Sequence, residues 1–185
     1  MAKPKMIPFP TDKKYNIIYA DPGWSYNDKC RSGSRGSEFK YKCMLLDDIC
    51  SLPVKNITAN DAWLFLWVTM PQLPNAFKVI ESWGFKFKCC GFMWAKRCKK
   101  NQNKWHFGMG SYTRANGELC LLATKGKPKR VSAAVSMLIE APVEKHSQKP
   151  SIVRDKIVEL CGDLPRIELF ARDKISGWDC YGDEI

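Results

Sequence analysis

YNIIYADPGW, at residues 15–24, joins a short apolar run to a tight turn. Residues 15–20 have the length and the aromatic and β-branched composition of a buried strand. Pro22 has no N–H to give to a sheet, so the strand must end before it and Asp21 is expected at its carboxyl end. Ligands bind beyond this end of the strands in open α/β sheets, which makes Asp21 the first candidate site residue.

The other apolar segments alternate between strand-like and helix-like patterns. Strands are expected at 62–68, 85–95, 118–123 and 166–170. Helices are expected from Pro74 to a stop at Gly84, and over 151–161 with a stop at Gly162, because apolar side chains recur there at helical spacing. Four tryptophans are assigned to the core rather than to a ligand: Trp63, Trp67, Trp83 and Trp94. Strands alternating with helices predict an α/β fold with a largely parallel sheet.

Length and composition favour one compact domain. The chain has 185 residues, of which 45% are hydrophobic and 12% aromatic, and this excludes a disordered chain. We expect a basic N-terminal extension over residues 1–14 and a single domain over 15–185. No apolar run reaches the roughly 18 residues that span a bilayer, and no signal-type segment is found, so a soluble, cytoplasmic protein is expected.

The nine cysteines and two histidines form no metal-binding pattern. The cysteines are scattered without a C-x-x-C pair, and their odd number favours reduced thiols in a reducing compartment. The histidines have no ligand-like spacing, so no metal site is expected.

The formal net charge is +11, from 30 basic and 19 acidic residues. Such a surplus favours a polyanionic partner, of which nucleic acid is the commonest, over simple solubility. Basic stretches at 29–42, 96–104 and 125–130 are expected to contact phosphates without reading sequence. No membrane partner is expected.

Motifs of other common enzyme classes are absent. No phosphate-binding loop of the form G-x-x-x-x-G-K-[ST] occurs, and Gly108-Met109-Gly110 lacks the third glycine of G-x-G-x-x-G. There is no G-x-S-x-G elbow and no neighbouring Cys-His pair. Kinase, dehydrogenase and hydrolase functions are therefore disfavoured.

A series of short motifs runs through the chain in a fixed order. They are DPGW at 21–24, LFLWV at 64–68, WGF at 83–85, WAK at 94–96, GMGSYTR with ELCLL at 108–122, HSQKP at 146–150, ELFAR at 168–172 and GWD with GDE at 177–184. With these motifs the chain resembles the family of the seventy-kilodalton catalytic subunit of the mRNA adenosine methyltransferase. It is most similar to the small phage and bacterial DNA adenine methyltransferases of that family.

The resemblance implies a fold, a reaction and a cofactor. The fold is a Rossmann-like, S-adenosylmethionine-dependent methyltransferase fold in permuted order, with the catalytic loop before the cofactor half. The reaction is methyl transfer from S-adenosyl-L-methionine to the exocyclic amino group of adenine in nucleic acid. DNA is favoured over RNA as the substrate, and for a phage-encoded protein the location is the cytoplasm of the bacterial host.

The resemblance also assigns site residues. The catalytic loop is Asp21, Pro22, Gly23 and Trp24. Positions near the acceptor nucleoside are Tyr41, Glu118 and Ser147. Cofactor-binding positions are Asp21, Lys149, Glu168, Arg172, Asp183 and Glu184, with Lys149 at the methionine carboxylate and Arg172 near the ribose. The plainer alternatives are strand-end charges for Glu118 and Glu168 and a solvated helix-entry lysine for Lys149.

The DPGW loop has a chemical logic for an amino group on a base. A carboxylate and a fixed backbone carbonyl accept hydrogen bonds from the two N–H groups and stabilise the positive charge that develops on nitrogen. Pro22 restricts the backbone of Asp21, and Trp24 offers a ring for base stacking. Gly23 replaces the family's second proline and makes the loop more costly to order. Asp183 stands where asparagine is usual and loses two hydrogen-bond donors.

Two other functions stay open on sequence. Gly23 is compatible with a catalytically inactive partner subunit that keeps the fold and binds nucleic acid. A plain RNA-binding module is also conceivable, but it leaves Asp21 and the cofactor motifs unexplained. A homodimer and a heterodimer are both compatible with the residues.

Overall fold

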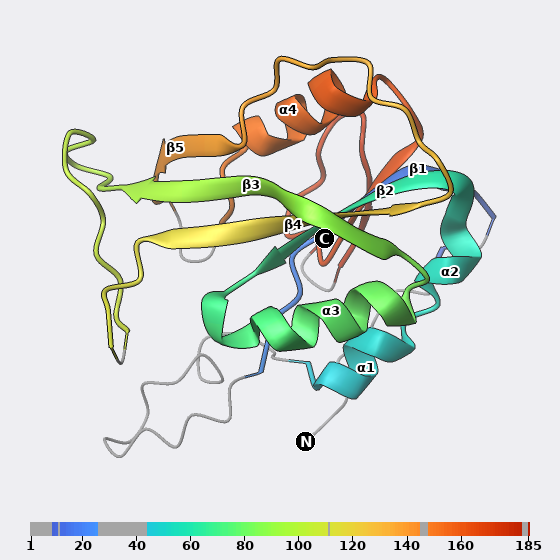
Figure 1. The fold of residues 1–185 in the computed structure, drawn as a ribbon, viewed down its shortest axis with the longest axis horizontal. Helices are drawn as coiled ribbons and strands as arrows, with labels where there is room; N and C mark the ends of the chain where they lie inside the picture. The colour runs from blue at the N-terminus through green and yellow to red at the C-terminus, as the bar shows by residue number, and fades with distance from the viewer. Residues whose placement is uncertain (1–8, 11, 26–43, 111, 145–147, 183–184) are drawn as a thin grey trace.

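The computed structural model describes residues 9–10, 12–25, 44–110, 112–144, 148–182 and 185. Within them a seven-stranded sheet has the order β5-β3-β4-β2-β1-β6-β7 (Figure 1). Its strands are β1 (Tyr15–Ala20), β2 (Thr58–Val68), β3 (Lys86–Arg97), β4 (Gly117–Lys125), β5 (Leu138–Pro142), β6 (Arg166–Leu169) and β7 (Asp179–Tyr181). The helices are α1 (Leu46–Ser51), α2 (Val54–Ile57), the 3-10 helix η2 (Met70–Gln72), α3 (Leu73–Ser82) and α4 (Ile152–Cys161). The predicted α/β class is confirmed.

β4 is the one strand of this sheet that runs against the others. β1 is parallel to β2 and β6, β6 to β7, and β3 to β5, whereas β4 is antiparallel to both β2 and β3. Between β3 and β4, residues 98–110 and 112–116 project beyond the sheet (Figure 1). The beginning of β4 therefore lies at the edge where the six other strands end. The expectation of a largely parallel sheet is confirmed.

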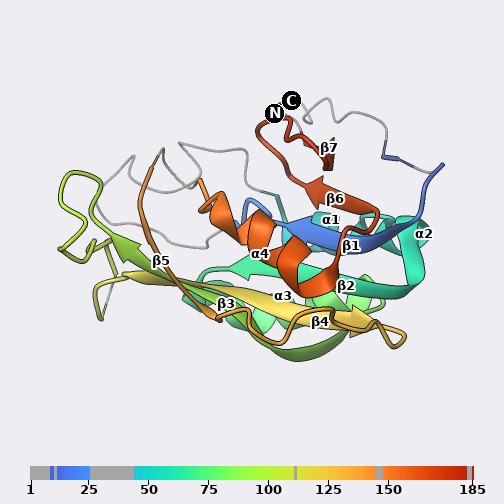
Figure 2. The same ribbon diagram turned by 90° about the horizontal axis from the view of Figure 1, so that it is seen from above.

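Helices cover both faces of the sheet (Figures 1 and 2). α1, α2 and α3 pack on one face and α4 on the other, and each face has its own buried cluster. Along β2, Leu64 and Leu66 enter the first cluster and Phe65 and Trp67 the second. Successive side chains of a strand point to opposite faces, so a strand that is covered on both faces is apolar throughout. The four tryptophans assigned to the core are all buried.

Glycines end the two predicted helices. Gly84 follows α3 with φ +79°, and Gly162 caps α4 with φ +89°, a conformation that L side chains rarely adopt. The short elements α1, α2, β5 and β7 were not predicted. They contain between three and six residues, too few for a periodic apolar pattern to be recognised.

The turn after β4 requires a glycine at position 126, and this requirement can be tested by substitution. Gly126 has φ +65°, and an added Cβ would lie 2.1 Å from Asp61 Oδ1 and 2.3 Å from Asn60 O. Gly126→Ala should therefore lower the free energy of unfolding by about 1–3 kcal/mol in urea titrations followed by tryptophan fluorescence. The control is Gly117→Ala, whose Cβ meets only Trp94 O at 3.5 Å. Equal stability of the two variants would contradict this account of the turn.

Candidate active site at the carboxyl edge of the sheet

Asp21 directly follows Ala20, the last residue of β1, as predicted. Ala20 pairs with Leu66 of β2 on one side and with Leu169 of β6 on the other. Both neighbours run parallel to β1 and end close to it. The Asp21 carboxylate therefore lies at the edge of the sheet where α/β folds bind ligands.

Glu118 reaches the same edge from the opposite chain direction. It is the second residue of β4 and pairs with Trp94 near the end of β3. Because β4 is antiparallel, its first residues lie beside the last residues of its neighbours. The reversed strand thus supplies a second carboxylate to the edge that holds Asp21.

Two lysines join these carboxylates into one charged cluster of Asp21, Lys149, Glu118 and Lys96. Lys149 Nζ donates to Asp21 Oδ2 at 2.8 Å and lies 3.3 Å from Glu118 Oε2. Lys96 Nζ donates to Glu118 Oε1 at 2.5 Å. The four side chains are between 10% and 20% exposed, so the charges are partly desolvated and compensate one another.

Aromatic rings lie beneath the charged cluster. Lys149 Nζ lies 5.6 Å from the Trp67 ring centroid, and Lys96 Nζ lies 4.9 Å from that of Trp94. Trp67 Nε1 donates to the Tyr19 hydroxyl at 2.7 Å, and Trp94 Nε1 donates to the Ala141 carbonyl at 2.9 Å. These bonds fix both indoles, which give the ammonium groups a rigid apolar floor with cation–π character.

The pKa values of the cluster are shifted from their ordinary values in different directions. Burial raises the pKa of the Asp21 carboxyl, although Lys149 opposes this. Burial acts in the same sense on Glu118, but the ammonium groups of Lys149 and Lys96 outweigh it and hold the pKa of Glu118 below its ordinary value. Burial alone would lower the pKa of Lys149, yet the two carboxylates raise it. Burial therefore dominates at Asp21, whereas the neighbouring ammonium groups dominate at Glu118.

The loop after Asp21 is held at several points. Trp24 Nε1 donates to the Trp67 carbonyl at 3.1 Å, and Met44 N donates to the Gly23 carbonyl at 2.9 Å. Gln72 Nε2 donates to the carbonyl of Ser25 at 2.8 Å. Because Trp24 is only 6% exposed and packs in the core, it anchors the loop from within. The expectation that its ring offers an open stacking face is corrected.

Glu168 is occupied by a partner within the protein. Arg154 on α4 binds both of its carboxylate oxygens, with Nε to Oε2 at 2.6 Å and Nη2 to Oε1 at 2.8 Å. Glu168 is 7% exposed, so this pair ties α4 to β6 beneath the site. A direct contact of Glu168 with a cofactor stays a prediction, and the observed geometry is that of a structural clamp.

Arg172 lies near the charged cluster. It contributes to lowering the pKa of Asp21, against the larger effect of burial. Between Glu168 and Arg172 the chain turns at Phe170, whose φ of +63° is unusual for a residue with a side chain. Such backbone conformations concentrate at functional sites.

Some predicted residues lie outside the described part of the chain. These are Tyr41, Ser147, Asp183 and Glu184, whose assignments stay predictions. Two site residues were missed by the sequence reasoning. Lys96 ends the WAK motif at a strand end and could have been found there, whereas Arg154 on α4 carries no local signal.

The basic stretch at 125–130 lies far from Asp21. Lys125 ends β4 and pairs with Ala62 near the beginning of β2. Nine residues of strand separate this turn from the carboxyl edge, roughly 25–30 Å. Phosphate contacts by this stretch stay a prediction, at a place far from Asp21, whereas Lys96 and the loop after it lie at the same edge as Asp21.

No group of metal-binding side chains is found among the described residues. In the same part of the chain, no helix is long and apolar enough to cross a membrane. The cysteines it contains are all free thiols.

Comparison with known proteins gives consistent matches. The MT-A70 family matches residues 15–184. The type II methyltransferase M.MunI of Mycoplasma sp. is 37% identical, over 94% of this chain and 78% of its own. The human N(6)-adenosine-methyltransferase catalytic subunit METTL3 is 25% identical over 93% of this chain and 28% of its own. The mouse N(6)-adenine-specific methyltransferase METTL4 is 25% identical over 94% of this chain and 38% of its own.

The ion pair at the centre of the cluster can be tested by titration. Lys149→Met should raise the pKa of Asp21 further, because it removes the attraction and the hydrogen bond that oppose burial. Carboxyl carbon NMR follows the titration, and Asp21→Asn assigns the signal. Lys156→Met on α4, whose lysine lies 3.7 Å from Glu159, should leave the Asp21 curve unchanged. Identical curves for Lys149→Met and the parent protein would rule out the pairing.

Proposed function

The chain belongs to the MT-A70 family, and from this premise we propose that it is an adenine-N6 methyltransferase that uses S-adenosylmethionine and acts on nucleic acid. The observation that carries the proposal is the Asp21 carboxylate, positioned by Lys149 at the carboxyl edge of the sheet. Of the relatives named above, METTL3 is an adenosine methyltransferase by name, METTL4 is an adenine methyltransferase and M.MunI is a type II methyltransferase.

DNA is the favoured substrate. The similarity to the bacterial type II methyltransferase is higher than that to METTL3 and covers most of both chains. The chain spans only about a quarter of METTL3, so METTL3 is a poor guide to the substrate of this chain. Single-stranded substrate avoids the few kcal/mol needed to flip an adenine out of a duplex.

Asp21 acts on the amino group of the target base. The lone pair of this nitrogen is delocalised into the ring, so it is a weak nucleophile. By accepting a hydrogen bond from the N–H, the carboxylate favours the more tetrahedral nitrogen and stabilises its developing positive charge. Pro22 restricts the backbone of Asp21, and the loop contacts from Trp24 to Trp67 and from Gly23 to Met44 keep it in place.

The neighbouring charges keep Asp21 ionised and oriented. Burial alone would favour the neutral acid, which is a weaker acceptor and has no negative charge to stabilise the developing positive charge. Lys149 opposes this, and Glu118 with Lys96 holds Lys149 from the other side. We expect the rate to fall as the pH drops through the raised pKa of Asp21.

The donor set at this edge fits S-adenosylmethionine. S-adenosylmethionine supplies an electrophilic methyl group when bound. Lys149 and Arg172 are cations suited to its carboxylate and ribose, and the carboxylates of Asp21 and Glu118 suit a sulfonium charge. The ion pair between Arg154 and Glu168 fixes α4 against β6, next to the residues that we assign to the cofactor. The family resemblance assigns Asp183 and Glu184 to cofactor binding as well.

We infer a permuted order of the two halves. The first strand in the chain, β1, lies in the middle of the sheet between β2 and β6. The strands β6 and β7, with α4, come last in the chain and provide the cofactor half. Holding methyl donor and amine in line across this junction removes much of the entropic cost of the reaction.

The alternative function is that of a catalytically inactive partner subunit, and the feature that favours it is Gly23 in place of the family's second proline. A glycine loosens the catalytic loop by roughly 0.5–1 kcal/mol. The bonds from Met44 to Gly23 and from Gln72 to Ser25 offset this loss of stiffness. Cofactor binding without turnover on any adenine substrate would favour the alternative.

Asp21 variants separate chemistry from cofactor binding. Asp21→Ala and Asp21→Asn should each lower single-turnover methyl transfer on the order of 100- to 1000-fold, because a preorganised charge is lost. Cofactor affinity, measured by calorimetry on the same preparations, should change far less. Asp48→Asn, at an exposed position of α1, serves as the matched control. Retained turnover in Asp21→Ala would refute the assigned chemistry.

Lys149→Ala tests the cofactor assignment. It should weaken S-adenosylmethionine binding by roughly 1.5–3 kcal/mol through loss of a charge-assisted bond to the carboxylate. Decarboxylated cofactor should bind the variant and the parent almost equally in calorimetry without nucleic acid. If both ligands lose affinity to the same extent, Lys149 does not meet the carboxylate.

A further inference from the structure

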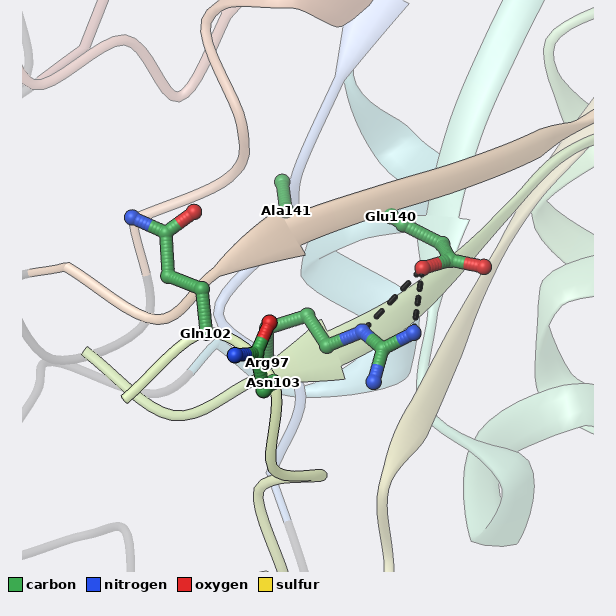
Figure 3. A pocket seen from close by; sticks show the side chains of 5 residues that line it. All are labelled: Arg97, Gln102, Asn103, Glu140 and Ala141. Atoms are coloured by element: carbon green, nitrogen blue, oxygen red, sulfur yellow. Dashed lines mark hydrogen bonds and ion pairs between the residues drawn. The ribbon is translucent and has the colours of Figure 1, made fainter. Parts of the chain in front are cut away.

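A second polar site lies beyond the ends of β3 and β5. It is a pocket of about 410 Å³ lined by Arg97, Gln102, Asn103, Glu140 and Ala141. Figure 3 shows the Gln102 amide on one side, the Arg97–Glu140 pair on the other and Ala141 of β5 behind them. None of these residues belongs to the charged cluster around Asp21.

The wall formed by Arg97 is held in place. Its Nε and Nη2 donate to Glu140 Oε2 at 3.1 and 2.5 Å, and its guanidinium lies 3.4 Å from the centroid of the Trp105 ring. The loop itself is closed by backbone bonds, from Cys98 N to Lys104 O and from His106 N to Lys96 O, both at 2.9 Å. The pocket is thus built on a short hairpin extension of β3.

The pocket and the charged cluster share one edge of the sheet. Lys96 belongs to the cluster and the next residue, Arg97, lines the pocket, because adjacent strand residues point to opposite faces. In the sheet order, β3 lies three strands from β1, which is roughly 15 Å at the usual strand spacing. With a rise of about 3.4 Å per stacked nucleotide, a base within four or five nucleotides of the target can reach the pocket.

We propose that this pocket receives a nucleobase flanking the target adenine and reads its edge, which rests on the proposed function. Arginine, glutamine, asparagine and glutamate are the side chains that read base edges by hydrogen bonds. Glu140 is an acceptor for an exocyclic amino group, and the Gln102 and Asn103 amides offer both donors and acceptors. The pocket therefore suits an amino-bearing base such as adenine or cytosine.

The surroundings of the pocket favour a nucleic acid as the occupant. Lys99, Lys100 and Lys104 are exposed on the same loop and can contact phosphates on either side of the base. Trp105 is 40% exposed and offers an indole for stacking. The loop, expected from the sequence to hold phosphates only, then also selects sequence.

The test uses the full chain and oligonucleotides with one adenine between randomised flanks. Both the bound pool and the methylated pool are sequenced. The parent protein should discriminate at one flanking position, and Gln102→Ala with Asn103→Ala should reduce that discrimination about tenfold. Glu140→Gln should relax the preference for an amino-bearing base at the same position. Lys99→Ala is the control and should weaken binding equally for all sequences.

The outcomes separate this proposal from the proposed function. An unchanged preference in the Gln102 and Asn103 double variant, or a uniform loss like that of Lys99→Ala, overturns base reading. So does a parent protein without any flanking preference. A parent that binds selectively but transfers no methyl group refutes the methyltransferase function, and its bound pool still decides whether the pocket reads a base.

Discussion

The ammonium group of Lys149 holds together carboxylates that come from distant parts of the chain. Asp21 follows the first strand, Glu118 begins β4, and Lys149 precedes α4. At low exposure a charge is tolerated only with a partner, so each of these residues depends on the others. The cluster therefore joins the two halves of the sheet edge, and within it Lys149 opposes the effect of burial on the pKa of the Asp21 carboxyl.

The reversed direction of β4 makes this cluster possible. If β4 ran parallel to β2 and β3, its first residues would lie at the opposite edge, and Glu118 would be separated from Asp21 by the length of a strand. The antiparallel connection through residues 98–116 brings Glu118 beside Lys96 at the end of β3. The same connection carries the pocket around Arg97. A single reversed strand thus places the charged cluster and the loop that lines the pocket at one edge of the sheet.

Trp24 and Glu168 are each held by a partner within the protein. Both stand in motifs that the family resemblance assigns to ligand binding. In the structure the Trp24 indole is buried and bonded to the Trp67 carbonyl, and the Glu168 carboxylate is bound by Arg154. These contacts make the site more rigid, and rigidity matters at any active site because misplacement of reacting groups by about an ångström is costly in rate.

The sequence by itself determined the fold class, the position of Asp21 and the boundaries of α3 and α4, because these follow from local patterns. A proline ends a strand, a glycine ends a helix, and a strand that is covered on both faces is apolar throughout. Motif order further pointed to Glu118 and Lys149 as site residues. Only the tertiary structure decided that Lys149 pairs with both Asp21 and Glu118, that Trp24 is buried and that residues 125–130 lie at the edge of the sheet opposite Asp21. Such facts depend on strand direction and on contacts between residues far apart in the chain, which leave no periodic signal in the sequence.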